Sequence, residues 1–405
     1  MRALLLWLRR GTSLLVLPTL VGFLLATSAS THPWLLDADW GVRYTSAAVF
    51  IFAPLVAAVA AYDVSRRVHP TLAHVARGSV RGAAALLLPV AAAVVWAVAA
   101  SAVSWTVIWT AVSLSAGIGP RDPWVYAETA AAYLAAAAVG ALVGHRAKGV
   151  AGAAFAAGLV LIVGTVLAGW GVKAFQVASS SGTMIGIERT PVRAGLAIAL
   201  NLSIALLCLA ALRLTTGVSR PSRVALAAVA LPLAAVLVMH VALPIRDSEY
   251  RPTREAQACV GDAPVVCGPE GAARLLQKAQ RDLAQARLAL RESQLPLPER
   301  FAIARGDAVR SLGPSVAELS YDPSALVDGH LRREALVQAL AAPRVCDALF
   351  HESTAPEYLD YLSEVGGWLD GQLQATAAGL EPAPASVQAA YAKLSTCETP
   401  SQASR

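Results

Sequence analysis

The sequence predicts an all-α membrane protein: a polytopic bundle of about seven transmembrane helices, followed by a mostly helical, disulfide-bonded extracytoplasmic domain. Of the 405 residues, 56% are hydrophobic and 15% are charged, which is more apolar than soluble proteins usually are. The apolar residues form runs of about 18 or more, long enough to cross a hydrocarbon core as helices. Four of the five cysteines follow the last run. We therefore expect a transmembrane domain at 1–245 and an extracytoplasmic helical domain at 246–405.

Seven apolar runs are long enough to be membrane spans. They cover about 11–29, 45–62, 83–112, 125–144, 149–170, 192–212 and 224–243. The third run is longer than the bilayer requires, so we expect it to tilt, bend or end early. The first run follows a basic start and precedes small residues, a pattern that also resembles a secretory signal peptide. Its length favours an uncleaved anchor, and cleavage would leave the tail on the same side.

Loop charge predicts the orientation of the spans. Basic residues precede the first span and follow the second, fourth and sixth: Arg2, Arg9, Arg10; Arg66, Arg67, Arg77, Arg81; Arg146, Lys148; Arg213, Arg220, Arg223. The alternate loops are mixed in charge. The positive-inside rule then places the N-terminus in the cytoplasm and, with seven spans, the C-terminal domain outside the cell membrane. The basic balance is explained by this orientation, so we predict no nucleic-acid partner.

The cysteine positions agree with this topology, because disulfides persist mainly outside the cytosol. The tail contains Cys259, Cys267, Cys346 and Cys397, which allow three pairings. We favour Cys259–Cys267, which closes a short turn, and Cys346–Cys397, which ties the last helix to the middle of the domain. Zinc ligation is the alternative, but a Cys-x-x-Cys pair is missing, so we predict no metal. Cys208, within an apolar run, is predicted to act as a small apolar residue.

The tail has the patterns of one hairpin and four helices. Cys259 to Cys267 suggests the hairpin, with Gly261 to Pro264 as its turn. Pro269-Glu270 then opens a helix whose apolar residues recur at helical spacing. The other helices are predicted at about 323–341, 356–377 and 385–396, separated by prolines.

The spans contain few ionisable residues. Glu128 is near a span end, and His240 is predicted to be a packed or interfacial residue of the last span. Coupled carriers usually keep such residues near mid-membrane. The sequence also lacks a Gly-x-x-x-x-Gly-Lys-Ser/Thr loop, and His351-Glu352 lacks the second histidine of a zinc-protease site. We predict no catalytic, cofactor or metal residues, and energy for uphill transport would come from a separate chain.

The second predicted span ends in Ala60-Ala61-Tyr62-Asp63, followed by Arg66-Arg67 and an amphipathic stretch to Arg81. This sequence resembles the start of the cytoplasmic coupling segment in ABC-2-type transporter permeases of actinobacteria. Gly140-Ala-Leu-Val-Gly144, followed by His145-Arg-Ala-Lys148, is similar to their tight turn between spans four and five. Met1–Arg10 is similar to a shortened interfacial connecting helix. The polar stretch from about Lys173 to Thr190 lies where these permeases often carry short re-entrant helices on the outer side. The resemblance covers about residues 1–215, whereas the seventh span and the tail depart from the family's six-span core.

This resemblance implies a coupling segment that docks onto an ATP-binding cassette subunit. Its residues are Asp63, Arg66, Arg67, Arg77 and Arg81. The alternative is that these arginines fix topology alone. Gly140 and Gly144 are predicted to let helices pack closely within the chain, with dimerisation as the alternative.

The expected function is the membrane-spanning permease subunit of an ABC-2-like exporter. Its expected partners are an ATP-binding cassette subunit, a second permease chain in a homodimer or heterodimer, and membrane lipids. A different function also fits the sequence: a membrane-anchored sensor or assembly factor that acts through its extracytoplasmic domain.

Overall fold

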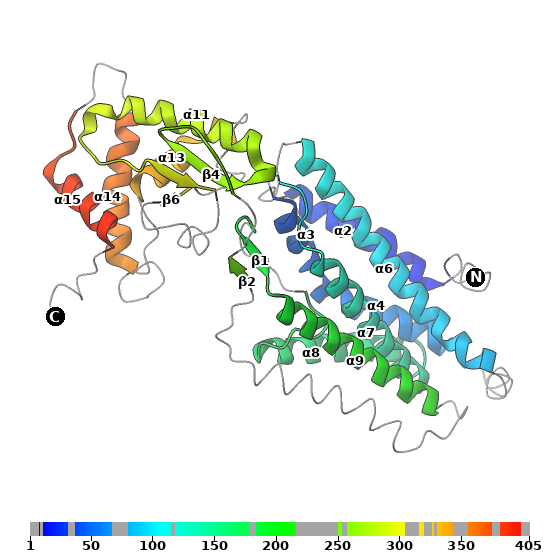
Figure 1. Ribbon diagram of the computed structural model, residues 1–405. Coiled ribbons are helices and arrows are strands. Elements are labelled where there is room, and N and C mark those ends of the chain that lie inside the picture. The colour runs from blue at the N-terminus through cyan, green and yellow to red at the C-terminus, as the bar shows by residue number, and fades with distance from the viewer. Residues whose placement is uncertain are drawn as a thin grey trace.

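The protein is an elongated helical bundle with a smaller region of helices and strands packed at one end (Figure 1). The computed structural model describes Leu8 and residues 11–30, 37–66, 80–114, 118–177, 184–215, 250–252, 257–303, 316–319, 326–327, 330–342, 355–374 and 381–397.

The bundle is built from residues 11–215. Its elements are η1 (Thr12–Leu15), α2 (Val16–Ser30), α3 (Ala38–Ser46), α4 (Val49–Ser65), α6 (Val80–Leu114), α7 (Trp124–Arg146), α8 (Gly149–Gly169), β1 (Ile187–Arg189) and α9 (Pro191–Thr215). By length and composition, four helices of the described part can cross a membrane: α6 from Leu87, α7, α8 and α9 to Arg213. A fifth span is formed if α3 and α4, which meet at 45°, are taken together. The chain therefore has the helices of a membrane protein.

The predicted spans at 83–112, 125–144, 149–170 and 192–212 correspond to α6, α7, α8 and α9. The predicted span at 45–62 corresponds to α4 together with the end of α3. Helix α3 begins before the predicted span because the Asp37 carboxylate accepts hydrogen bonds from Asp39 N and Trp40 N, which caps the helix. The run at 11–29 forms η1 and α2. The predicted seventh span, 224–243, lies outside the described residues, as does His240.

Helices α4 and α7 approach each other closely at two glycines. A Cβ added at Gly140 would lie 2.1 Å from the carbonyl oxygen of Ala57. A Cβ at Gly144 would lie equally close, 2.1 Å, to the carbonyl oxygen of Ala61. Small residues let backbones approach in this way, and dispersion forces then hold membrane helices together. Both glycines therefore pack within the chain.

The C-terminal region contains a four-stranded sheet and several helices. Its elements are β2 (Tyr250–Pro252), β3 (Gln257–Val260), β4 (Val265–Pro269), η2 (Glu270–Ala272), α11 (Ala273–Ala289), η3 (Arg291–Ser293), β5 (Arg300–Ala302), β6 (Val316–Glu318), β7 (Leu326–Val327), β8 (His330–Leu331), α13 (Arg333–Ala341), α14 (Ala355–Gln374) and α15 (Ala385–Thr396). The sheet order is β3-β4-β5-β6, with β3 antiparallel to β4 and the other pairs parallel. Leu276, Leu283, Phe301 and Tyr391 are buried in its core. Burial also raises the pKa of the Tyr391 phenol, whose hydroxyl donates to Pro296 O.

The prediction of an all-α chain is corrected by this sheet. The hairpin at 259–267 and the helices at 356–377 and 385–396 have counterparts in β3–β4, α14 and α15. Strands β5 and β6 were missed because each has three residues, too few to show a periodic pattern. The predicted helix at 323–341 begins only at Arg333, since β7 and β8 form an antiparallel pair before it.

One predicted disulfide is present in the structure. Cys259 and Cys267 are bonded and lie directly opposite each other on β3 and β4. Cys397 is also disulfide-bonded, and its predicted partner, Cys346, lies outside the described residues. Cys208 is a buried free thiol on α9.

Thiol counting tests the full pairing. We expect denatured, unreduced protein to react with maleimide-polyethylene glycol at one thiol, Cys208, because the other four cysteines are paired. Reduction before labelling should give five reactive thiols, read as mass shifts on a gel. A Cys208→Ala variant is the control and should show no shift without reductant. Labelling of five thiols before reduction would contradict both disulfides.

Candidate functional site

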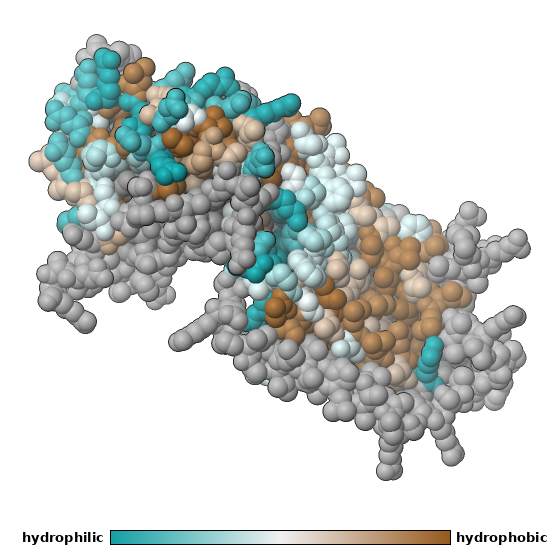
Figure 2. Space-filling model, viewed as in Figure 1, coloured by the Kyte–Doolittle hydropathy of each residue, from teal (hydrophilic) through white to brown (hydrophobic). Residues whose placement is uncertain are grey.

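Charged side chains from distant segments meet where the bundle adjoins the C-terminal region. We call this end of the bundle the junction. Figure 2 shows hydrophilic and intermediate surface there, between the brown apolar surface of the bundle and the C-terminal region. The residues that form this junction network are Asp37, Asp39, Arg43, Arg121, Asp122, Glu128, Arg189 and Tyr250.

Two ion pairs of the junction network are buried. Arg43 pairs with Asp122, and their side chains are 0% and 8% exposed. Arg189 Nε lies 3.2 Å from Glu128 Oε1, and both side chains are 1% exposed. A buried charge is costly unless it is paired and hydrogen-bonded, and removing one partner leaves the other uncompensated. These pairs therefore fix α3 against the segment just before α7, and β1 against α7.

The side chains of two aspartates hold the loops of the junction by accepting hydrogen bonds from backbone amides of those loops. Asp37 caps α3 and also accepts a hydrogen bond from Met184 N. Asp39 Oδ1 accepts hydrogen bonds from Arg121 N at 2.9 Å and Asp122 N at 3.1 Å. The same carboxylate pairs with the Arg121 guanidinium at 3.3 Å. Three chain segments that are far apart in the sequence are therefore joined at α3.

The C-terminal region contacts the junction through a strand pair and one tyrosine. Strand β2 is antiparallel to β1, with Tyr250 directly opposite Arg189. The guanidinium carbons of Arg43 and Arg189 lie 5.5 Å and 5.7 Å from the centre of the Tyr250 ring. Such contacts add cation–π attraction to the backbone pairing. Ile118 and Ile185, from the bundle's loops, also belong to the apolar core of the C-terminal region.

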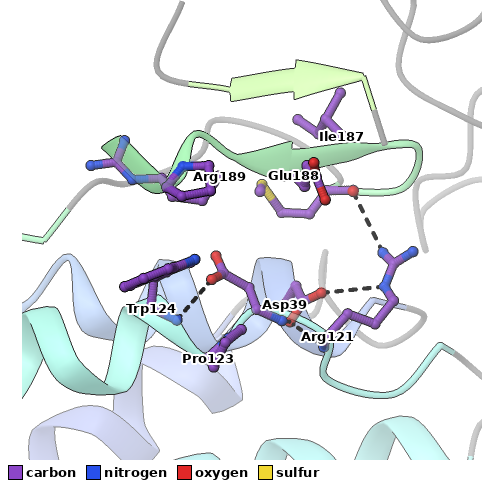
Figure 3. Close-up of a pocket in the computed structure, with 10 residues that line it drawn as sticks. Asp39, Arg121, Pro123, Trp124, Ile187, Glu188 and Arg189 are labelled. Atoms are coloured by element: carbon purple, nitrogen blue, oxygen red, sulfur yellow. Dashed lines mark hydrogen bonds and ion pairs between the residues drawn. The ribbon is translucent and has the colours of Figure 1, made fainter. Parts of the chain in front are cut away.

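A pocket of about 320 Å³ opens between β1 and the layer formed by α3 and the start of α7 (Figure 3). Its walls combine charged and apolar residues: Asp39, Arg121, Asp122, Pro123, Trp124, Met184, Ile187, Glu188, Arg189 and Pro191. The volume is near the lower end of the range for small-molecule sites. The pocket is therefore a candidate binding site beneath the docked strands.

Residues 170–177 form a second unusual feature, a non-helical segment that folds back between α8 and α9. Phe175 N donates to Asn201 Oδ1 at 3.0 Å, and Asn201 is ten residues beyond the start of α9, about 15 Å along it. Gln176 Nε2 donates to Gly164 O at 2.9 Å, inside α8. Irregular backbone inside a bundle of membrane-spanning helices is tolerated where other groups of the protein form hydrogen bonds with it. Phe175 also has a positive φ of 57°, which is uncommon for a non-glycine residue.

The opposite end of the bundle is basic, and we call it the basic end. Arg66, Arg146, Lys148 and Arg213 are exposed there. Gly149 N donates to Ser65 Oγ at 3.2 Å, which joins the end of α4 to the start of α8. Two loops that the sequence predicted on one side therefore meet at one end.

The residues predicted for ATPase coupling have different environments. Asp63 is buried and accepts hydrogen bonds from the Thr12 hydroxyl and Ser13 N, so it caps the first helix. Arg66 is exposed, with its guanidinium carbon 5.6 Å from the centre of the Tyr62 ring. Arg67 and Arg77 lie outside the described residues, and Arg81 is described in its backbone alone. A coupling role for the arginines stays a prediction.

Sequence reasoning missed most of the junction network. The sequence places Glu128 near a span end but does not pair it with Arg189, and it shows Arg43 and Asp122 only as members of loops that are mixed in charge. The available signal was that the loops opposite the basic end carry charges of both signs. Among the residues that the structure describes, no group of three or more His, Cys, Asp or Glu could hold a metal ion. His351 and Glu352 lie outside them.

Comparison with protein-family models, with curated proteins and with solved structures gives no match for this chain. The arrangement of the junction, the re-entrant segment 170–177 and the basic end is therefore the ground for assigning a function.

Proposed function

We propose that the chain is the membrane-spanning permease subunit of an ABC-2-like exporter, with ATP hydrolysis on a separate chain. The observation that carries this proposal is the segment 170–177, which re-enters the bundle between α8 and α9 and is held there by Asn201. It lies where the resemblance to ABC-2 permeases leads us to expect a re-entrant element. It is irregular rather than helical, and transporters use irregular backbone where it lines a path for cargo.

The two ends of the bundle suit this function in different ways. The basic end would face the cytoplasm by the positive-inside rule, where Arg66 and the following residues would contact an ATP-binding cassette subunit. The junction would then lie outside the membrane with the C-terminal region. A second permease chain would pack along the apolar face of α6, where Val103, Val107 and Leu114 are exposed.

Co-purification with an ATPase assay tests the proposal. We expect the full chain, isolated from its native membrane, to carry a chain with a nucleotide-binding loop and to support ATP hydrolysis. Reversing two charges with Arg66→Glu and Arg67→Glu should release that chain, because like charges across a contact repel. Arg291→Glu is the control, since Arg291 is 70% exposed on the C-terminal region. The proposal would be refuted if no ATPase chain accompanied the native protein, or if the double variant retained that chain as well as the unchanged protein does.

A second candidate function is a membrane-anchored sensor or assembly factor, and the docking of β2 on β1 favours it. A change in the C-terminal region would reach the junction through Tyr250. Deleting residues 257–405 while retaining β2 separates the two functions. Retained export supports the permease, whereas loss of all activity with normal ATPase association supports the sensor.

A further inference from the structure

We propose that the pocket beneath β1 binds a small zwitterion, of the kind that forms the head group of an amino phospholipid. The pocket is more than a shallow depression of the surface, because charged side chains in its walls are themselves buried. The side chains of Asp39 and Asp122 are 5% and 8% exposed, and that of Arg189 is 1% exposed. This inference is independent of the exporter, since an anchored sensor could use the same site.

The charges in the wall select a molecule that carries both signs. Asp39 pairs with Arg121, and Glu188 pairs with Arg251 of β2 at 2.7 Å. The lining itself contains acidic side chains (Asp39, Asp122, Glu188) and basic ones (Arg121, Arg189), so an ion of one sign meets like charges as well as opposite ones. A zwitterion can match this alternation, because complementary potentials favour a partner with the same spacing of opposite charges. Paired residues can still bind, since a guanidinium has five donors and a carboxylate about four acceptor sites.

The arrangement of the wall suggests an orientation for the ligand. Figure 3 shows Trp124 and Arg121 at opposite ends of the lower wall, with Asp39 between them and β1 above. An indole face and carboxylates attract an ammonium group. A guanidinium binds phosphate or carboxylate oxygens in a fork. We therefore place the cationic end near Trp124 and the anionic end near Arg121, which is 24% exposed.

The rest of the wall is apolar, and the pocket is small. Pro123, Met184, Ile187 and Pro191 complete the lining. A volume of about 320 Å³ accommodates a head group but not acyl chains. The site lies at the end of the membrane-spanning helices, where head groups are found, so both a lipid and a free zwitterion could reach it.

Calorimetric titration of the full chain in nanodiscs tests the site. The probe is glycerophosphoethanolamine, and its two halves, ethanolamine and glycerol 3-phosphate, are titrated separately. We expect the zwitterion to bind at least about tenfold more tightly than either half, because each half loses one charged contact. Nanodiscs of phosphatidylglycerol and of phosphatidylethanolamine distinguish the sources. Competition in the latter identifies a lipid ligand, and equal affinity in both identifies a free zwitterion.

Variants identify the location of the site. Arg121→Gln and Trp124→Leu should each weaken binding of the probe about tenfold or more. Two variants are used because Arg121→Gln also leaves Asp39 without its ion pair. Arg333→Gln, which changes an exposed ion pair with Asp370 far along the C-terminal region, should bind like the unchanged chain. The proposal is overturned if the probe gives no saturable heat, if either half binds as tightly, or if folded variants at both positions bind unchanged.

Discussion

Replacing Gly140 with alanine is expected to destabilise the bundle strongly. The added methyl carbon would lie 2.1 Å from the Ala57 carbonyl oxygen, and neither backbone can move without separating α4 from α7. Overpacking of a close interior contact costs about 1–3 kcal/mol and occasionally more. We expect a clear fall in the midpoint of thermal unfolding, measured in detergent by size-exclusion chromatography of heated samples.

The matched control is the same substitution on a neighbouring helix. No atom lies within 4 Å of a Cβ added at Gly158 in α8, so Gly158→Ala should leave the midpoint unchanged or raise it slightly. The comparison also separates packing from dimerisation. If Gly140 served a dimer contact instead, Gly140→Ala would change the oligomeric state while the protomer unfolded at the same temperature as the Gly158→Ala variant.

The sequence was most informative where the bilayer or a covalent bond sets the structure. Helices α7, α8 and α9 agree with their apolar runs because a span must be continuous and about 20 residues long. The β3–β4 hairpin could be predicted from Cys259 and Cys267, and α15 from the prolines before it. In each case the determining feature is local in the chain.

The junction could not be predicted in this way because its contacts are not local. Arg43 and Asp122 are 79 positions apart, and Arg189 and Glu128 are 61 positions apart. Each lies in or beside a loop, where a lone charge is most often solvated. Their burial depends on how α3, α7 and β1 meet, and on Tyr250 from beyond the bundle. The strands β5 and β6 are likewise defined by parallel partners and not by their own three residues.

The Arg43→Met substitution is expected to give the largest loss of stability at the junction. It leaves the Asp122 carboxylate buried without its guanidinium, a change that costs about 3–5 kcal/mol for buried pairs. It also removes one of the two cations beside the Tyr250 ring. The free energy of unfolding can be measured in mixed micelles with increasing fractions of sodium dodecyl sulfate.

Two comparisons separate the lost ion pair from the lost side-chain volume. The double variant Arg43→Met, Asp122→Leu removes both charges, so it should be less destabilised than Arg43→Met alone. Arg333→Met breaks an ion pair whose side chains are 45% and 36% exposed, and it should cost less than about 1 kcal/mol. If Arg43→Met were as stable as Arg333→Met, the buried pair would not be holding α3 against the segment just before α7.

The same variant shows whether the ion pair also holds the C-terminal region in place. Glu188 and Arg251 are directly opposite on β1 and β2 and are partly exposed, so cysteines at both positions should form a cross-link. We expect a lower yield of that cross-link with Arg43→Met than with Arg333→Met, because the contact of the Arg43 guanidinium with the Tyr250 ring is then lost. An unchanged yield together with reduced stability would mean that the strand pair docks independently of the charges beneath it.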